Sequence, residues 1–212
     1  MYLPKHFEQA DVAALQQFVH VHPFGALVTM TSGGLDGNHL PLLIDVQPAP
    51  YGTLRGHVAR ANRIWRECDG ADALVIFQGP DSFISPSWYP TKRDTGAVVP
   101  TWNYVVVHAH GRLRVVEDRD WLRAHVEALT NRHEGSREVP WAVTDAPNDY
   151  IEKMVGAIVG IEMPIARLTG KWKLSQNRTD RDRMGVVDGL TREGTESAST
   201  MAALVRSTFE RS

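Results

Sequence analysis

The feature that most constrains this chain is a series of short apolar segments in its first half, each bounded by Gly, Pro or Asp. The first is GALVTMT (25–31), which ends at a Ser-Gly-Gly turn, and TLRGHVA (53–59) and ALVIFQG (73–79) follow the same pattern. HLPLLIDV (39–46) and a longer run at 98–116 complete the series. Apolar and β-branched residues between closely spaced turn signals are typical of strands. We therefore expect an antiparallel sheet or barrel.

Helices are predicted on either side of these strands. Apolar residues with helical spacing begin after Asp11 and stop at His22, which precedes a proline and so avoids helical backbone angles. Residues 118–133 predict a second helix with one apolar stripe. A final strand is expected within 156–170 and an amphipathic helix within 197–212. The fold class is therefore mainly β with α (α+β).

Length and charge exclude several classes of protein. The 212 residues suffice for one main domain, and 23 basic against 25 acidic residues provide no excess of positive charge for nucleic acid or an anionic membrane. The single cysteine, Cys68, excludes an internal disulfide and fits a reducing compartment. The chain has no apolar run of the roughly 18 residues that would span a membrane, and its start does not resemble a signal peptide. We expect a soluble, cytoplasmic protein.

The histidines do not predict a metal site. His108 and His110 in VHAH share one face of a strand, but no carboxylate stands at ligand spacing, so packing or hydrogen bonding is favoured over zinc or iron. The sequence lacks a G-x-S-x-G elbow, a P-loop and a G-x-G-x-x-G fingerprint. No residue has the setting of a nucleophile or general base, so we predict no catalytic residue.

The stretch LRGHVARANR (54–63) suggests an anion site. It runs from an extended segment into a short predicted helix within 60–70, which would bring backbone N–H groups close to Arg60, Asn62 and Arg63. The alternative is that these arginines only decorate an exposed helix.

Three further segments each combine a tryptophan with hydrogen-bonding groups: SPSWYPTK (85–92), PTWNY (100–104) and GKWKLSQN (170–177). Together with a phosphate site, they would suit a flat aromatic ligand with a phosphate tail, such as flavin mononucleotide (FMN). The competing interpretation is that Trp88 and Trp102, like Trp172, are core or interface residues. The residues alone leave both interpretations open.

Several segments nevertheless resemble one known family. They are MYLPKHF (1–7), HPFGALVT (22–29), HLPLLID (39–45), GHVARAN (56–62), ISPSWYPTK (84–92), VPTWNYVVVHAHG (99–111) and GKWKLSQN (170–177). In this order they resemble the PaiB-like FMN-binding negative transcriptional regulators of the split-barrel flavin-binding superfamily, over the chain from its start to about residue 190.

The resemblance implies a six-stranded antiparallel split barrel at 1–190 with a helical extension at 191–212, and a homodimer with FMN in a cleft between subunits. HLPLLI would lie along the flavin ring, and residues 57–63 would meet the phosphate. Arg63 stands where relatives usually have proline. The predicted FMN-binding residues are His39, Leu40, Pro41, Leu42, His57, Val58, Ala59, Arg60, Asn62, Arg63, Trp88, Lys92, Trp102, Asn103, Lys171, Lys173 and Gln176.

Two functions remain open: an FMN protein, with redox or sensing activity and an oxidoreductase among the options, and a DNA-binding repressor that uses FMN only as a ligand. The only arginine-rich run, RTDRDR (178–183), is diluted by aspartates, and no helix-turn-helix is evident, so no sequence motif supports DNA binding. Haem is a third option because some split-barrel relatives use it. GKWKLSQN either closes the cofactor cleft through its lysines or is an exposed strand end.

Overall fold

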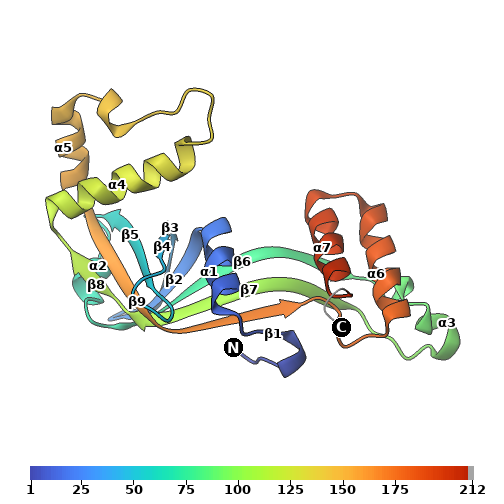
Figure 1. The fold of residues 1–212 in the computed structure, drawn as a ribbon. Coiled ribbons are helices and arrows are strands. Elements are labelled where there is room, and N and C mark those ends of the chain that lie inside the picture. The colour runs from blue at the N-terminus through green and yellow to red at the C-terminus, as the bar shows by residue number, and fades with distance from the viewer. Residues whose placement is uncertain (210–212) are drawn as a thin grey trace. The chain divides into compact units, whose positions relative to one another are not determined.

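The structure, a computed structural model, describes residues 1–209 (Figure 1). Its antiparallel sheet has the strand order β3-β2-β6-β7-β9-β5-β4, and β1 and β8 each pair with β9. The strands are β1 (Glu8–Gln9), β2 (Phe24–Thr31), β3 (Gly34–Pro41), β4 (Leu43–Asp45), β5 (Thr53–Ala59), β6 (Asp72–Ile84), β7 (Thr101–Arg112), β8 (Arg114–Val116) and β9 (Ile158–Lys173).

The helices of the described residues complete an α+β fold. None of the helices within residues 1–209 combines the length and apolar character that crossing a membrane requires. The α-helices are α1 (Val12–Val21), α2 (Ile64–Glu67), α3 (Thr91–Thr95), α4 (Arg119–Glu134), α5 (Asn148–Gly156), α6 (Asp180–Glu193) and α7 (Glu196–Ser207); the 3-10 helices are η1 (Lys5–Phe7), η2 (Pro86–Trp88) and η3 (Val143–Asp145).

The strand count differs from the expected six for a simple reason. Six of the nine strands in residues 1–209 have seven or more residues: β2, β3, β5, β6, β7 and β9. The other three, β1, β4 and β8, have two or three residues each. Such short segments carry too few residues for an alternating apolar pattern to stand out in the sequence.

The chain forms two compact units. Unit 1 contains Met1–Asp11, Gln78–Val107 and Thr169–Ser212, and unit 2 contains Val12–Phe77 and His108–Leu168. The predicted boundary at residue 190 lies within α6, and the division at that point stays a prediction.

Unit 2 contains the barrel core. The hairpin of β2 and β3 turns at Ser32 and Gly33, and β2 also pairs with β6 so that Ala26 lies opposite Ile76. Alternate residues of β2 and β6 are buried, which is the pattern of strands with one face on a core. β5 pairs with both β4 and β9, and β3 lies against β5. Unit 2 therefore brings the two predicted segments HLPLLID and GHVARAN together.

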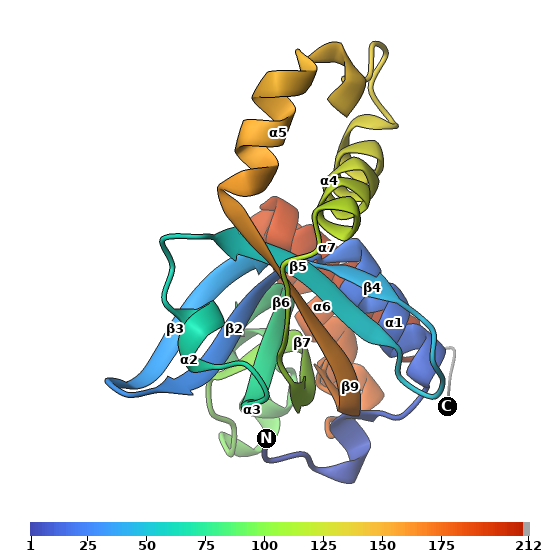
Figure 2. The ribbon, with the colours of Figure 1, turned by 90° about the vertical axis from the view of Figure 1, so that its left-hand side faces the viewer.

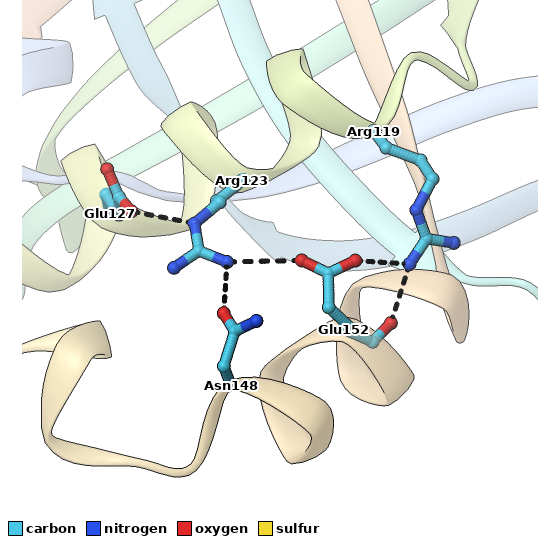
Figure 3. Close-up of polar contacts among 5 residues, drawn as sticks. All are labelled: Arg119, Arg123, Glu127, Asn148 and Glu152. Carbon is cyan, nitrogen blue, oxygen red and sulfur yellow. Dashed lines mark hydrogen bonds and ion pairs between the residues drawn. The ribbon is translucent and has the colours of Figure 1, made fainter.

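Helices α4 and α5 form a paired arm of unit 2 (Figure 2). Asp118 caps α4 through the backbone N–H of Trp121, as its position in the sequence predicts. Arg119 and Arg123 of α4 both bind the Glu152 carboxylate of α5, at 2.7 and 3.1 Å (Figure 3). Beneath these ion pairs, the two helices and η3 share a small apolar core formed by Leu122, Val143, Ile151 and Val155.

Unit 1 contains a helical hairpin formed by α6 and α7 (Figure 1). Met201 and Val205 of α7 are buried, as the apolar spacing of the C-terminal segment predicts. α6 also lies against η2, where a side chain at Gly189 would overlap the ring of Trp88. Helix α6 was not predicted because its many Arg, Asp and Gly residues hide the apolar positions Val186, Val187 and Leu190.

Several predicted boundaries need correction. The segment at 39–46 is divided between β3 and β4, because the buried Leu42 interrupts the strand and its N–H donates to the carbonyl of Pro23. The run at 98–116 is divided at Leu113 in the same way. The helix expected within 60–70 is reduced to the four residues of α2. The last predicted strand, β9, continues to Lys173 and includes the start of GKWKLSQN. Residues 210–212 of the predicted C-terminal helix lie outside the described residues.

Candidate functional site

A cavity of about 1060 Å³ in unit 2 lies between strands β4 and β5 and helices α1 and α4. This volume is slightly above the usual range for small-molecule sites, roughly 300 to 1,000 Å³. Its lining combines apolar residues with cationic and hydrogen-bonding groups: His20, Leu43, Ile44, Asp45, Val46, Arg55, Trp121, Ala124, His125, Ala128, Asn131 and Arg132.

The pairing of β4 with β5 positions the charged residues that line this cavity. Leu43 of β4 lies opposite Arg55 of β5, so both residues are on the strand pair that lines the cavity. The Arg55 guanidinium binds Asp45 at 3.2 Å and Glu162 at 3.1 Å. Glu162 is buried and also binds Arg114 and the indole N–H of Trp121. The positive charge of Arg55 is therefore already matched by carboxylates.

Two histidines meet at one wall of the cavity. His125 of α4 approaches His57 of β5, with 3.2 Å between Nε2 and Nδ1, and its ring stacks on that of Trp121. Burial lowers the pKa of His125 to about 4, and the nearby His57 and Arg55 act in the same direction. Burial also lowers the pKa of His57. Burial therefore favours the neutral form of both rings, and one of these two nitrogens donates its hydrogen to the other.

A second arginine, Arg132, also lines the cavity. Arg132, in the last turn of α4, donates from Nη1 to Nδ1 of His20 on α1 at 2.8 Å. This partner is an imidazole, and within residues 1–209 Arg132 forms no ion pair with a carboxylate. Its positive charge remains available to a ligand.

The turn after β5 carries the predicted phosphate residues, and Arg60 there is held by the protein. Its Nε donates to the carbonyl of Gly156 at 3.0 Å, and its Nη2 donates to that of Ile158 at 3.3 Å. Nη1 binds Glu117 at 2.7 Å. Arg60 thus ties the end of β5 to the start of β9, and its guanidinium is occupied.

Asn62 and Arg63 follow in the same turn. Asn62 donates to the side chain of Asn38 on β3 at 2.7 Å and accepts from the backbone N–H of Ile64 at 3.0 Å, which fixes the turn between two strands and α2. Arg63 is exposed, and among the described residues its side chain forms no ion pair or hydrogen bond. The free cation at this turn is therefore Arg63.

The predicted residues of β3 and β5 divide between two faces. His39 is exposed and its ring lies 6.1 Å from that of Phe24, whereas Leu40 and Leu42 are buried in the core. Pro41 is half-buried, Val58 is buried and Ala59 is exposed. Among the predicted residues of β3 and β5, His57 contacts the cavity lining, because its ring forms a hydrogen bond with that of His125.

In unit 1, the first tryptophan segment mainly has structural contacts. Trp88 lies against α6, and Lys92 of α3 donates to the hydroxyl of Ser87 at 3.2 Å. Trp102 is exposed, and its ring meets Phe83 edge to face. Asn103 is fully buried and pairs with the Ser175 hydroxyl at 2.9 Å. Asn103 therefore joins β7 to the segment GKWKLSQN.

GKWKLSQN itself forms the end of β9 and a turn with internal hydrogen bonds. Gln176 accepts from the N–H of Leu174 and donates to the carbonyl of Trp172, at 2.7 and 2.6 Å. Lys171 is buried, donates to the carbonyl of Tyr2 at 3.1 Å and lies over the rings of Tyr2 and Tyr104.

Lys173 donates to the hydroxyl of Thr101, and burial lowers its pKa, assisted by Lys171 and Arg178. Within residues 1–209, neither lysine of the segment has a carboxylate partner. The segment therefore combines structural hydrogen bonds with uncompensated positive charge.

Most of the cavity residues are not among the predicted binding residues, although Leu43 and Ile44 belong to the segment HLPLLI that was expected along the flavin ring. Arg55 and Leu43 stand two positions and one position, respectively, from the predicted residues His57 and Leu42. His20 and Arg132 lie on two different helices and are 112 positions apart in the sequence, so no local sequence pattern connects them. Trp121 and His125 were recognised only as parts of a helix.

Comparisons with known proteins agree on the family. Residues 1–167 match the family model described as "Putative FMN-binding domain". The "Protease synthase and sporulation protein PAI 2" of Bacillus subtilis is 34% identical over 206 residues, covering 97% of this chain and 96% of the relative. "Uncharacterized protein AN0679" of Emericella nidulans is 33% identical over 242 residues, with the same coverage of each chain.

Two solved structures share the fold at low sequence identity. The FAD and heme binding protein of Mycobacterium smegmatis has a TM-score of 0.59 at 16% identity, covering 82% of this chain and 78% of its own. The flavocytochrome Anf3 of Azotobacter vinelandii has a TM-score of 0.58 at 12% identity, covering 84% and 73% respectively. The fold, the match to the family model and the similarity to PAI 2 show that the chain belongs to the PaiB-like family of FMN-binding split-barrel proteins, with FMN as its cofactor.

Proposed function

We propose that the protein binds FMN along β3–β4 and β5 of unit 2 and uses it in redox chemistry with a small molecule. The phosphate would lie at the turn of Asn62 and Arg63, and the ring would extend toward the cavity beside Leu43. The observation that carries this proposal is the exposed Arg63, which lacks a protein partner within residues 1–209 while Asn62 is fixed beside it. Phosphate recognition needs donors that the protein has not already paired, and the Arg63 guanidinium is such a donor.

The chemistry of the cavity fits the flavin ring. Leu43 and Ile44 offer an apolar surface, and Trp121 and Asn131 add an aromatic ring and an amide. Flavin rings are held by this combination of an apolar face and a few hydrogen-bonding groups, and the bound FMN supplies reversible electron uptake. The residues of the chain would position the ring and exclude water from it.

The lysines of unit 1 remain predicted FMN contacts. Lys171 and Lys173 have no carboxylate partner within residues 1–209, so they could neutralise an anion. Positive charge beside a flavin favours its reduced, anionic form. Lys171→Met and Lys173→Met variants therefore belong in the same titrations as the arginine variants described below.

The proposal includes a homodimer in the cytoplasm. The outer faces of β2, β3 and β6 in unit 2 expose apolar side chains, and a second copy would cover them. The buried thiol of Cys68 is compatible with a reducing compartment.

A DNA-binding repressor is the alternative function. The net charge of −2 opposes non-specific attraction to DNA, and no observation in the described residues favours the repressor. Any regulatory role would then act through the flavin or a partner protein.

The test compares FMN with riboflavin, which lacks the phosphate. We expect Arg63→Ala to weaken FMN about 10- to 100-fold and to leave riboflavin within about twofold, because a charge-assisted hydrogen bond contributes roughly 1.5 to 3 kcal/mol. Binding is measured by quenching of flavin fluorescence. Arg66→Ala is the matched control, because Arg66 is an exposed arginine that lies over the ring of Trp65.

Arg60→Ala separates the two arginines of the turn. Because the Arg60 guanidinium binds two backbone carbonyls and Glu117, its loss should weaken both flavins alike by loosening the turn. If Arg60→Ala instead weakens FMN selectively and Arg63→Ala does not, the phosphate role belongs to Arg60. If neither variant distinguishes FMN from riboflavin, the phosphate lies elsewhere and the proposed placement fails.

A further inference from the structure

The cavity in unit 2 contains two guanidinium groups with different electrostatic surroundings. Arg55 is matched by the carboxylates of Asp45 and Glu162. Arg132, which also lines the cavity, has the imidazole of His20 as its partner. We propose that this cavity also binds a small organic anion, an apolar molecule with one carboxylate, whose charged group lies against Arg132.

The carboxylates along α4 do not neutralise Arg132. Glu127, five residues earlier, binds Arg123 at 3.3 Å. Glu134, two residues later, binds Arg137 at 2.9 Å and accepts from the N–H of Trp141. A partly buried guanidinium without a carboxylate is costly unless a ligand supplies the negative charge. The structure therefore leaves one positive charge for an incoming anion.

Partial burial of Arg132 agrees with this role. Desolvation lowers the pKa of its guanidinium, which means that water only partly stabilises the positive charge there. Nη1 is engaged with His20, and the remaining N–H groups have no partner among residues 1–209. A guanidinium presents its donors in a planar fork that matches a carboxylate. Asn131 lines the cavity next to it and adds an amide.

The walls beside Arg132 are apolar. Leu43, Ile44 and Val46 come from the strand side, and Ala124 and Ala128 come from α4. Both alanines are exposed, and their short side chains leave the space open. A ligand that reaches Arg132 would therefore lay its body against hydrocarbon, which favours an apolar or aromatic molecule over a sugar or a peptide.

The inference rests on the proposed function in one respect, since it makes the organic anion a neighbour of the flavin ring in the same cavity. Typical sites that hold a whole small molecule span roughly 300 to 1,000 Å³. A cavity of about 1060 Å³ therefore has room for more than the flavin ring alone. Recognition of the anion by Arg132 does not depend on where the FMN phosphate lies.

The experiment uses the FMN-loaded protein and two probes of similar shape, 1-naphthoate and the uncharged 1-naphthalenemethanol, with affinities measured by calorimetry. We expect Arg132→Gln to weaken 1-naphthoate about 10- to 100-fold and to change the alcohol by less than about twofold. Arg137→Gln is the control, because Arg137 already has Glu134 as a partner and does not line the cavity. Ala128→Phe fills the apolar wall and should weaken both probes.

Three results would overturn the inference. One is an equal loss of both probes in Arg132→Gln, which would mean that Arg132 only shapes the cavity. Another is the absence of 1-naphthoate binding to the wild-type protein at millimolar concentration. The third is a loss of FMN from Arg132→Gln with unchanged 1-naphthoate affinity, which would assign Arg132 to the cofactor. The Arg63 variant, tested with FMN and riboflavin, reports on the proposed function separately.

Discussion

His125 is buried between Trp121 and His57, and its surroundings oppose a positive charge. Burial lowers its pKa from 6.5 to about 4. Between these two pH values the unfolded chain binds a proton that the folded protein does not, so stability is present above pH 6.5 and is lost as the pH falls. A shift of this size corresponds to about 3 kcal/mol at most, by the conversion of roughly 1.4 kcal/mol per pKa unit.

The prediction at this scale concerns His125→Gln, in which the position no longer titrates. The variant should be less stable than the wild type at pH 7, because it loses the stacking on Trp121. The difference in free energy of unfolding between the two proteins should shrink as the pH falls from 6.5 to 4. Urea unfolding at several pH values measures it, and a difference that is constant with pH would contradict the pKa assignment.

The contact between α6 and η2 makes a prediction at the scale of elements. Replacing glycine by alanine inside a helix normally stabilises a protein by about 0.5 to 1 kcal/mol, because glycine is a poor helix former. At Gly189, however, the new Cβ would overlap the Trp88 ring. We expect Gly189→Ala to lower the free energy of unfolding by about 1 to 3 kcal/mol, the usual cost of overpacking.

The same substitution should change sign once Trp88 is removed. In a Trp88→Ala background, Gly189→Ala has no ring to displace and should stabilise α6 by about 0.5 to 1 kcal/mol. Urea unfolding of the four proteins in this cycle measures the reversal. If Gly189→Ala stabilises both backgrounds equally, Trp88 does not lie on α6 in solution, and its predicted contact with FMN becomes the better explanation for a tryptophan at this position.

At the scale of the whole molecule, the outer face of the sheet in unit 2 exposes apolar side chains. Met30 is 61% exposed and Leu35, its partner across the β2–β3 hairpin, is 75% exposed. Leu74 and Ile76 of β6 lie opposite Val28 and Ala26 of β2 on the same face. A contiguous apolar surface of this kind is typical of an interface between protein chains.

We predict that light scattering will give twice the mass of one chain for the wild-type protein. The double variant Met30→Glu, Leu35→Lys should shift the protein toward monomers, because charges at the interface would have to be desolvated. Val139→Glu is the control, since Val139 is also an exposed apolar residue but lies on a loop. A wild-type monomer that still binds FMN would contradict the expectation, implied by the family resemblance, that FMN lies in a cleft between subunits.

Much of the fold could be predicted from local patterns. The strands β2 and β5 and the helices α1 and α4 begin and end within a residue or two of their predicted limits, because turn residues and caps act locally. Helix α6 could not be predicted in this way. Its many charged residues and its glycines oppose a helix assignment, and its apolar positions gain their stability from packing against α7 and η2.

The sequence by itself identified the family and, through the family resemblance, the cofactor, and it located most strands along the chain, since these depend on motifs and turn residues that are contiguous in the chain. Only the tertiary structure decided which arginine of the turn after β5 is available to a ligand. The guanidinium of Arg60 binds Gly156, Ile158 and Glu117, whereas the side chain of Arg63 forms no hydrogen bond or ion pair within residues 1–209. It also decided that Arg132 donates to His20 where both side chains line the same cavity. The physical reason is that the availability of a charge depends on every partner within a few ångströms, and those partners come from distant parts of the chain.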